Sequence, residues 1–379
     1  MRPLQTSETI IGLLHRVYSM TDGVSITHVP LRYMPGAWGD LVPVSPTQCM
    51  WIGSVQGRDT PGDVEGLNCC ILLTRLSDGT YTDELIPCPV EGGLGRLCGT
   101  TACVVGGELY EYIGHSGEMW VLSLDTYEWR QEHPLDHARH SDPEEEPLDL
   151  LSFEREGMFH VYWGYPATPE DPVPQTQIEK YDPETRRWIE CTPLPTGSTI
   201  GENRAYMGGD ILRSLAWHLQ VWVHLHCVRE RERTVTGQRI EGVEIRGIDP
   251  GVYAYSLVYS ILPLDRHIVC AVRRFAEGVD DLYCYSLVSQ EWVSLGRVPA
   301  MGQSVGGMAY MGTLGELPAG ETERLAETRT LESSGESDGG RSGGIVAAMY
   351  GCLEPPSTDT VYSLQLSLPG GEELKPYAQ

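Results

Sequence analysis

Basic residues are scarce in this chain of 379 residues. Lys and Arg number 27 against 53 Asp and Glu, so the formal net charge is −26. A surface of that sign repels phosphate backbones and anionic lipid head groups, and we expect neither a nucleic-acid partner nor a membrane partner. The chain also lacks an apolar run near the roughly 18 residues that span a bilayer. Its first residues lack a secretory pattern of basic start, apolar middle and small-residue cleavage site. These absences predict a cytoplasmic protein.

Phenylalanine and regular cysteine spacing are also missing. The chain has 3 Phe against 9 Trp and 19 Tyr, a bias toward aromatic residues with a polar tip that suit half-buried strands. Its 11 Cys are odd in number and show no CxxC spacing, although Cys69 and Cys70 are adjacent. This pattern argues against a disulfide framework, and we expect reduced and mostly buried thiols.

One hairpin pattern recurs along the chain. Its clearest copy is Lys180 to Pro195, in which Tyr181 and Trp188 flank the turn-forming sequence Asp-Pro-Glu-Thr. The segments Val121 to Trp129 and Cys284 to Trp292 keep the Trp at the same offset. Three such copies predict a repeat protein built from strand–turn–strand units.

Weaker copies share only the first strand of the hairpin. When all copies are aligned on the residue seven before the Trp, their spacings scatter around the roughly 50-residue period of a kelch blade, with one short blade implied between Tyr255 and Tyr285. Upstream of the hairpins lie runs that fit an inner strand pair, best seen in Ala102 to Gly114, where Gly106 and Gly107 read as a tight turn. The weaker copies are Leu73 to Tyr81, Tyr253 to Val258 and Val361 to Leu366.

These segments resemble the kelch repeat, a four-stranded antiparallel propeller blade. The resemblance covers residues 41–368 and implies an all-β, kelch-type β-propeller of six blades, with five or seven left open. The family's diglycine is reduced here to pairs such as Ile113-Gly114 and is absent from the fourth and fifth blades. An unrelated antiparallel sandwich is the alternative fold.

Both ends of the chain fall outside the repeats. Residues 1–40 form an N-terminal segment with one short helix expected at Glu8 to Val17 and a strand at Val24 to Val29. Such a terminal strand usually completes the last blade and closes the ring, which removes an exposed sheet edge. Residues 369–379 are expected to be a C-terminal tail.

Two insertions interrupt the repeats. Residues 313–343 are acidic and rich in Glu, Gly and Ser, which predicts a disordered loop within the last blade. Its Ser333 to Asp338 is either a phosphorylation site or a plain solvated spacer. A protruding ribbon is expected from Val221 to Ile240, with its turn at Thr236-Gly237 and with Arg229, Arg231 and Arg233 on one face. That basic face either contacts an acidic partner or is simply solvated.

Two groups of residues raise the question of a metal. Glu132, Asp136 and His140 match the ExxxDxxxH spacing of the iron-dependent nitrile-specifier proteins, which are also kelch propellers, but Pro134 weakens the helix that would align them. His224 and His226 point to one side of a strand without an evident third ligand. We interpret the first group as a solvated acidic loop and the second as packing between blades. We therefore expect no metal, no cofactor and no catalytic residue.

The leading functional hypothesis is a monomeric protein-interaction scaffold or adaptor. Long, charged loops fan out from a rigid ring in such a fold, and they suit the binding of a protein partner. The alternative is an enzyme on the same scaffold, of the sugar oxidase, sialic acid epimerase or iron-dependent specifier type. The fold alone does not choose between them.

Overall fold

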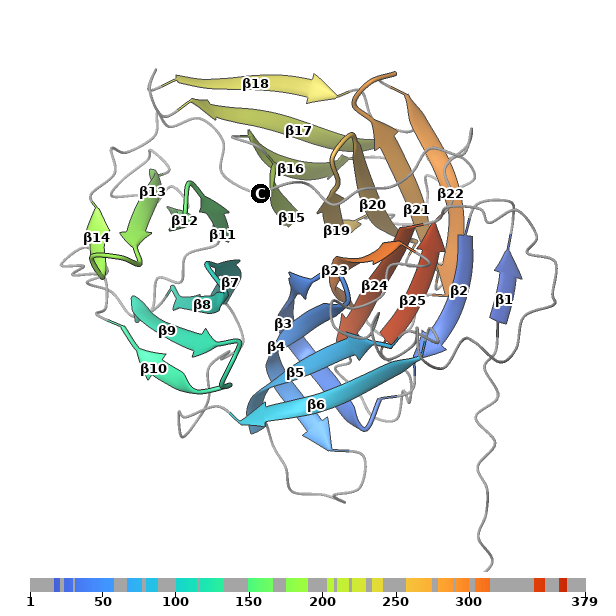
Figure 1. The fold of residues 1–379 in the computed structure, drawn as a ribbon. Helices are drawn as coiled ribbons and strands as arrows, with labels where there is room; N and C mark the ends of the chain where they lie inside the picture. The colour runs from blue at the N-terminus through green and yellow to red at the C-terminus, as the bar shows by residue number, and fades with distance from the viewer. Residues whose placement is uncertain are drawn as a thin grey trace, which may run out of the picture.

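Every regular element in the described part of the chain is a β-strand (Figure 1). The computed structural model describes residues 17–20, 24–29, 31–57, 67–76, 80–87, 100–114, 116–132, 149–165, 175–189, 203–207, 210–217, 220–229, 234–240, 257–274, 279–289, 291–299, 304–313, 344–351 and 361–366. No helix in these ranges is long and apolar enough to cross a membrane.

The described strands form six antiparallel sheets, five of which have four strands in sequence order. The first sheet is β3 (Tyr33–Ser45), β4 (Gln48–Gly57), β5 (Leu67–Arg75) and β6 (Tyr81–Pro87). The second is β7 (Thr100–Val105), β8 (Glu108–Ile113), β9 (Glu118–Ser123) and β10 (Trp129–Gln131). The third is β11 (Asp149–Arg155), β12 (Met158–Tyr165), β13 (Gln175–Asp182) and β14 (Arg187–Ile189). The fourth is β15 (Asn203–Met207), β16 (Asp210–Trp217), β17 (Gln220–Arg229) and β18 (Thr234–Ile240). The fifth is β19 (Leu257–Pro263), β20 (His267–Arg274), β21 (Val279–Ser286) and β22 (Trp292–Pro299).

The last sheet, which we call the closing sheet, joins the two ends of the chain. Its strands are β23 (Ser304–Thr313), β24 (Gly344–Gly351), β25 (Val361–Leu366), β2 (Val24–Val29) and β1 (Val17–Met20), hydrogen-bonded in that order. The strand expected at Val24 to Val29 is thus β2, and it pairs antiparallel with β25. An N-terminal strand therefore completes a sheet whose other members come from the C-terminal part of the chain.

The sheets stand in a ring around a common axis (Figure 1). The first strand of each sheet lies innermost, and each inner strand contacts the inner strand of the next sheet, so that the contacts run β3, β7, β11, β15, β19, β23 and back to β3. The prediction of an all-β propeller is confirmed. The described residues supply six sheets to this ring.

The core lies between successive sheets rather than within one of them. Alternate residues of β7 serve opposite interfaces, because side chains alternate across a strand. Ala102 and Val104 pack against the first sheet, whereas Cys103 and Val105 pack toward the third. The largest fully buried side chains include Trp51, Tyr110, Tyr112, Tyr162 and Tyr181. Each large apolar side chain buried in this way stabilises the fold by about 1.5–3 kcal/mol.

The predicted Tyr/Trp hairpins are present in the predicted register. Tyr181 lies directly across from Trp188 and Tyr285 from Trp292, with ring centroids 5.4 Å and 5.0 Å apart. Leu122 lies directly across from Trp129 in the second sheet. The seven-residue offset therefore reflects cross-strand pairing around a turn of the same length in all three hairpins.

The glycine pair expected as a turn joins β7 to β8. Gly106 and Gly107 have φ angles of +58° and +83°, a region that glycine enters without a steric penalty. Nothing lies within 4 Å of a Cβ placed at either position, so backbone conformation rather than space requires glycine here.

Two sequence predictions about the hairpins are wrong in detail. Leu257 and Val258 belong to β19, the first strand of the fifth sheet, so the segment Tyr253 to Val258 does not supply the outer hairpin of the fourth blade. That outer hairpin is β17–β18, whose sequence lacks the Tyr/Trp pair that marks the clearest copies. The ribbon reverses between Arg229 and Thr234, not at Thr236-Gly237, because Thr236 and Gly237 pair within the ladder with Cys227 and His226.

The remaining differences concern the N-terminal segment and the insertion. The first sheet begins at Tyr33, before the expected start at residue 41, and Val17 begins β1 rather than ending a helix. Residues 8–16, 314–343 and 369–379 lie outside the described residues. The insertion connects β23 to β24, which are paired strands of the closing sheet.

Candidate functional site

One face of the ring, which we call the turn face, carries two turns from each of the first five sheets. They are the turn between the first and second strands and the turn between the third and fourth. Backbone hydrogen bonds join the two turns within a sheet: Leu124 N–H donates to Gly107 O at 3.3 Å, and Leu287 N–H donates to Arg266 O at 2.9 Å. In the first sheet Arg75 N–H donates to Thr47 O at 2.8 Å. The two turns are therefore fixed relative to each other.

The outer turns are also ordered internally by the side chain six residues before the Trp. The Ser123 hydroxyl accepts a hydrogen bond from Thr126 N–H, and the Ser286 hydroxyl accepts one from Ser289 N–H. In the third sheet Asp182 accepts from Glu184 N–H at 2.9 Å and from the Thr185 hydroxyl at 2.7 Å. Serine and aspartate commonly order turns in this way. Equivalent residues thus rigidify equivalent turns in three sheets.

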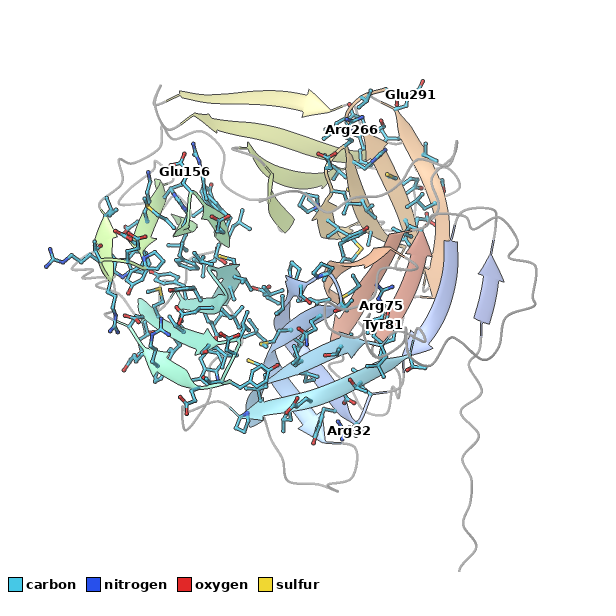
Figure 2. All side chains as sticks on the ribbon, viewed as in Figure 1. Arg32, Arg75, Tyr81, Glu156, Arg266 and Glu291 are labelled. Atoms are coloured by element: carbon cyan, nitrogen blue, oxygen red, sulfur yellow. The ribbon has the colours of Figure 1, made fainter. Side chains whose placement is uncertain are left out.

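Among the described residues, the turn face exposes charged groups and one large apolar side chain. Val288, at the tip of the β21–β22 turn, is 72% exposed. Figure 2 labels Glu156, Arg266 and Glu291, which come from turns of the third and fifth sheets. The exposed charged residues described on these turns are mainly acidic: Asp125, Glu128, Glu156, Glu184, Asp265 and Glu291, against Arg186, Arg187 and Arg266.

Glu132, the first residue of the ExxxDxxxH pattern, lies just after β10 at the junction of the second and third sheets. Its side chain is 1% exposed. Arg130 donates to Oε1 at 2.8 Å, and the Tyr181 hydroxyl donates to Oε2 at 2.8 Å. Arg186 donates to both carboxylate oxygens, at 2.9 Å each. The Glu132 carboxylate therefore joins β10 to the third sheet through an ion-pair cluster.

The cluster extends to Glu108 and is held in its charged form. Arg130 also donates to both oxygens of Glu108, which accepts a further bond from the Tyr110 hydroxyl at 3.0 Å. Burial tends to raise the pKa of Glu132, but hydrogen bonds from Arg130, Tyr181 and Arg186 outweigh it and leave the pKa below its ordinary value. The hydrogen bond from Arg130 lowers the pKa of Glu108. Both carboxylates thus remain ionised at neutral pH.

Arg186 reaches Glu132 from a strained turn. Its backbone has φ +55°, and Tyr127, at the equivalent place two residues before Trp129, has the same φ of +55°. Non-glycine residues rarely adopt this left-handed region. The sequence does not predict this cluster, because Glu132 is about fifty residues away from Tyr181 and Arg186. The sequence indicates only that the β9–β10 and β13–β14 hairpins have turns of the same length.

The other predicted site residues can be placed only in part. Asp136 and His140 lie outside the described residues, as do Arg231, Arg233 and the segment Ser333 to Asp338. The described portion contains no group of three His, Cys, Asp or Glu side chains that could hold a metal ion. His224 and His226 lie on β17, across from Arg213 and Ile211 of β16.

Comparison with known proteins reveals the fold and nothing finer. No protein-family model and no curated protein matches the chain. The solved structure of YjhT aligns at 12% identity over 92% of this chain and 98% of that chain, with a TM-score of 0.51. A protein of unknown function from Dyadobacter fermentans aligns at 11% identity over 91% of this chain and 100% of that chain, also with a TM-score of 0.51. The chain is therefore similar to β-propeller proteins in fold.

Proposed function

We propose that the chain is a non-catalytic, kelch-type interaction scaffold that binds a protein partner through its turn face. The observation that carries the proposal is the rigid display of that face. Paired turns are fixed to each other by backbone hydrogen bonds and ordered internally by Ser123, Asp182 and Ser286. Loops held on a rigid ring are suited to recognition, because little conformational entropy is lost when they bind.

The kelch assignment in this proposal rests on the Tyr/Trp hairpins. Tyr181 pairs with Trp188 and Tyr285 with Trp292 across equivalent turns, as the resemblance implied. The second sheet keeps the Trp but has Leu122 in place of the Tyr. The hairpin is thus retained in part, which supports a divergent kelch repeat.

The charge of the turn face favours a partner with a basic surface. Its exposed side chains include Glu128, Glu184 and Glu291, and the whole chain carries a formal charge of −26. Opposite charge speeds association and selects among partners more than it adds affinity. We further propose that this chain acts as a monomer in the cytoplasm.

Affinity capture with charge-reversal variants tests the proposal. We expect the unmodified protein to capture a specific partner from native lysate, and a variant with Glu128→Lys, Glu184→Lys and Glu291→Lys to lose most of it. A matched variant with Glu144→Lys, Glu145→Lys and Glu146→Lys reverses the same number of charges between β10 and β11, outside the segments that form the turn face. That control should retain the partner. Equal capture by all three proteins would refute binding through the turn face.

A further inference from the structure

A second carboxyl group, Glu111 on β8, is buried without any hydrogen bond. Its side chain is fully buried, and neither carboxyl oxygen has a hydrogen-bond partner. Three of the other sheets have an uncharged residue at the equivalent position, whereas the fourth sheet has Arg213 there. In four sheets this position lies two residues after equivalent residues of the second strand, namely Cys49, Leu109, Phe159 and Ile268. The residues at the position itself are, in the same order, Trp51, Glu111, Val161 and Cys270. Glu111 therefore replaces a core side chain with an ionisable one.

Glu111 faces the first sheet, which places a second acid, Asp40, on the same interface. Leu109, which shares its face of β8, packs with Val42 and Ile52 of the first sheet. Asp40 precedes Val42 by two residues on β3, so its side chain lies on the same face, and it pairs with Ile52. Burial and then the charge of Asp40 raise the pKa of Glu111 to about 8. Burial raises the pKa of Asp40 to about 6.

The other groups on this interface offer Glu111 no counter-charge. Trp120, directly across from Glu111 on β9, has a buried indole N–H without a partner. The remaining titratable groups that strand alternation places on these two faces are acidic or neutral: Glu118 on β9, Glu84 on β6, Cys70 on β5 and Tyr127 beyond β9. An unpaired buried carboxylate is so costly that the group takes up a proton instead.

We propose that Glu111 is a neutral acid in the folded protein, and that loss of its proton opposite Asp40 loosens the contact between the first and second sheets. The interface is thereby a pH-sensitive link built into the ring. A proton can neutralise Glu111 without a cavity for a bound ion. Only one of the two carboxyl groups, Glu111 or Asp40, has to carry it. This inference does not depend on the proposed binding function.

The direction of the pH effect follows from the shift. The folded pKa of Glu111 is about 8, above the ordinary value of 4.5, so the folded state holds a proton that the unfolded chain releases. Its contribution to stability is complete below pH 4.5, declines as the pH rises and is gone above about 8. One proton difference changes the unfolding equilibrium constant about tenfold per pH unit.

The test compares chemical denaturation of the full chain at several pH values. Between pH 4.5 and 8 we expect the unfolding constant of the unmodified protein to rise by up to about tenfold per pH unit more than that of Glu111→Gln. Glu84→Gln, which removes an exposed acid facing the same interface, should follow the unmodified protein. Parallel curves for Glu111→Gln and the unmodified protein would overturn the proposal.

A second variant keeps the test decisive if Glu111→Gln fails to fold. Glu111→Val copies the residue that the third sheet has at this position, and it should fold and lack the same pH-dependent component. A further measurement compares the stability of the unmodified protein and of Glu111→Val with and without calcium or magnesium. If either ion stabilised the unmodified protein but not Glu111→Val at pH 8, the pair would be a cation site and the proton proposal would fail.

Discussion

Glu132 illustrates, at the scale of single residues, how a buried carboxylate can join two sheets of the ring. It accepts hydrogen bonds from Arg130 in its own sheet and from Tyr181 and Arg186 in the next. Such bonds to a charged group are stronger than neutral ones. A metal at this position would have to displace donors that already fill both carboxylate oxygens.

Replacing Glu132 by Gln should therefore weaken the junction. The change removes the charge that three donors share, and we expect the free energy of unfolding to fall by about 1–2 kcal/mol, because Arg130 and Arg186 are partly exposed and screened. Chemical denaturation at pH 7 measures this. Glu128→Gln, at an exposed position nearby, should change stability by less than about 0.5 kcal/mol.

The pH dependence gives the same prediction a second readout. Because the pKa of Glu132 is lowered in the folded state, its contribution is present above the ordinary value of 4.5 and is lost as the pH falls through the folded pKa. Glu132→Gln should thus lose less stability on acidification than the unmodified protein. Identical acid unfolding of the two proteins would show that the cluster does not hold Glu132 ionised.

At the scale of elements, the closing sheet tolerates a long connection between paired strands. Thr313 of β23 and Gly344 of β24 lie directly across from each other, so a short linker can join them. We expect replacement of the connection by a Gly-Ser linker to change the free energy of unfolding by less than about 1 kcal/mol, because closure entropy depends only weakly on loop length. Thermal and denaturant melting measure the change. A loss of several kcal/mol would mean that the connection packs against the ring.

The elements that sequence predicted correctly are those defined by local pairing. Tyr181 and Trp188 are close in sequence and meet across one turn, so their spacing carries the register. The hairpin β17–β18 lacks that pair, and its turn was misplaced because alternation alone does not say where a strand reverses. The sites were harder to predict. Glu132 meets Arg186, and Glu111 shares an interface with Asp40, only because the ring stacks one sheet on the next.

At the scale of the whole molecule, the ring is closed by strands from its two ends. β2 pairs with β25, while β3 contacts β23 on the inner side of the same junction (Figure 1). Closure of this kind leaves no open edge between the first and last sheets. The proposed binding function depends on it, because the turn face gathers turns from sheets around the whole ring.

A crosslink between β2 and β25 tests that closure most directly. Thr27 and Ser363 are direct partners, and the Cα separation of such antiparallel pairs suits a disulfide. We predict that Thr27→Cys combined with Ser363→Cys forms a link between the two introduced cysteines under mild oxidation, identified by peptide mass mapping. Thr27→Cys combined with Thr176→Cys, on β13 of the third sheet, should form none. Absence of the first link, or equal formation of both, would contradict a ring closed by β2.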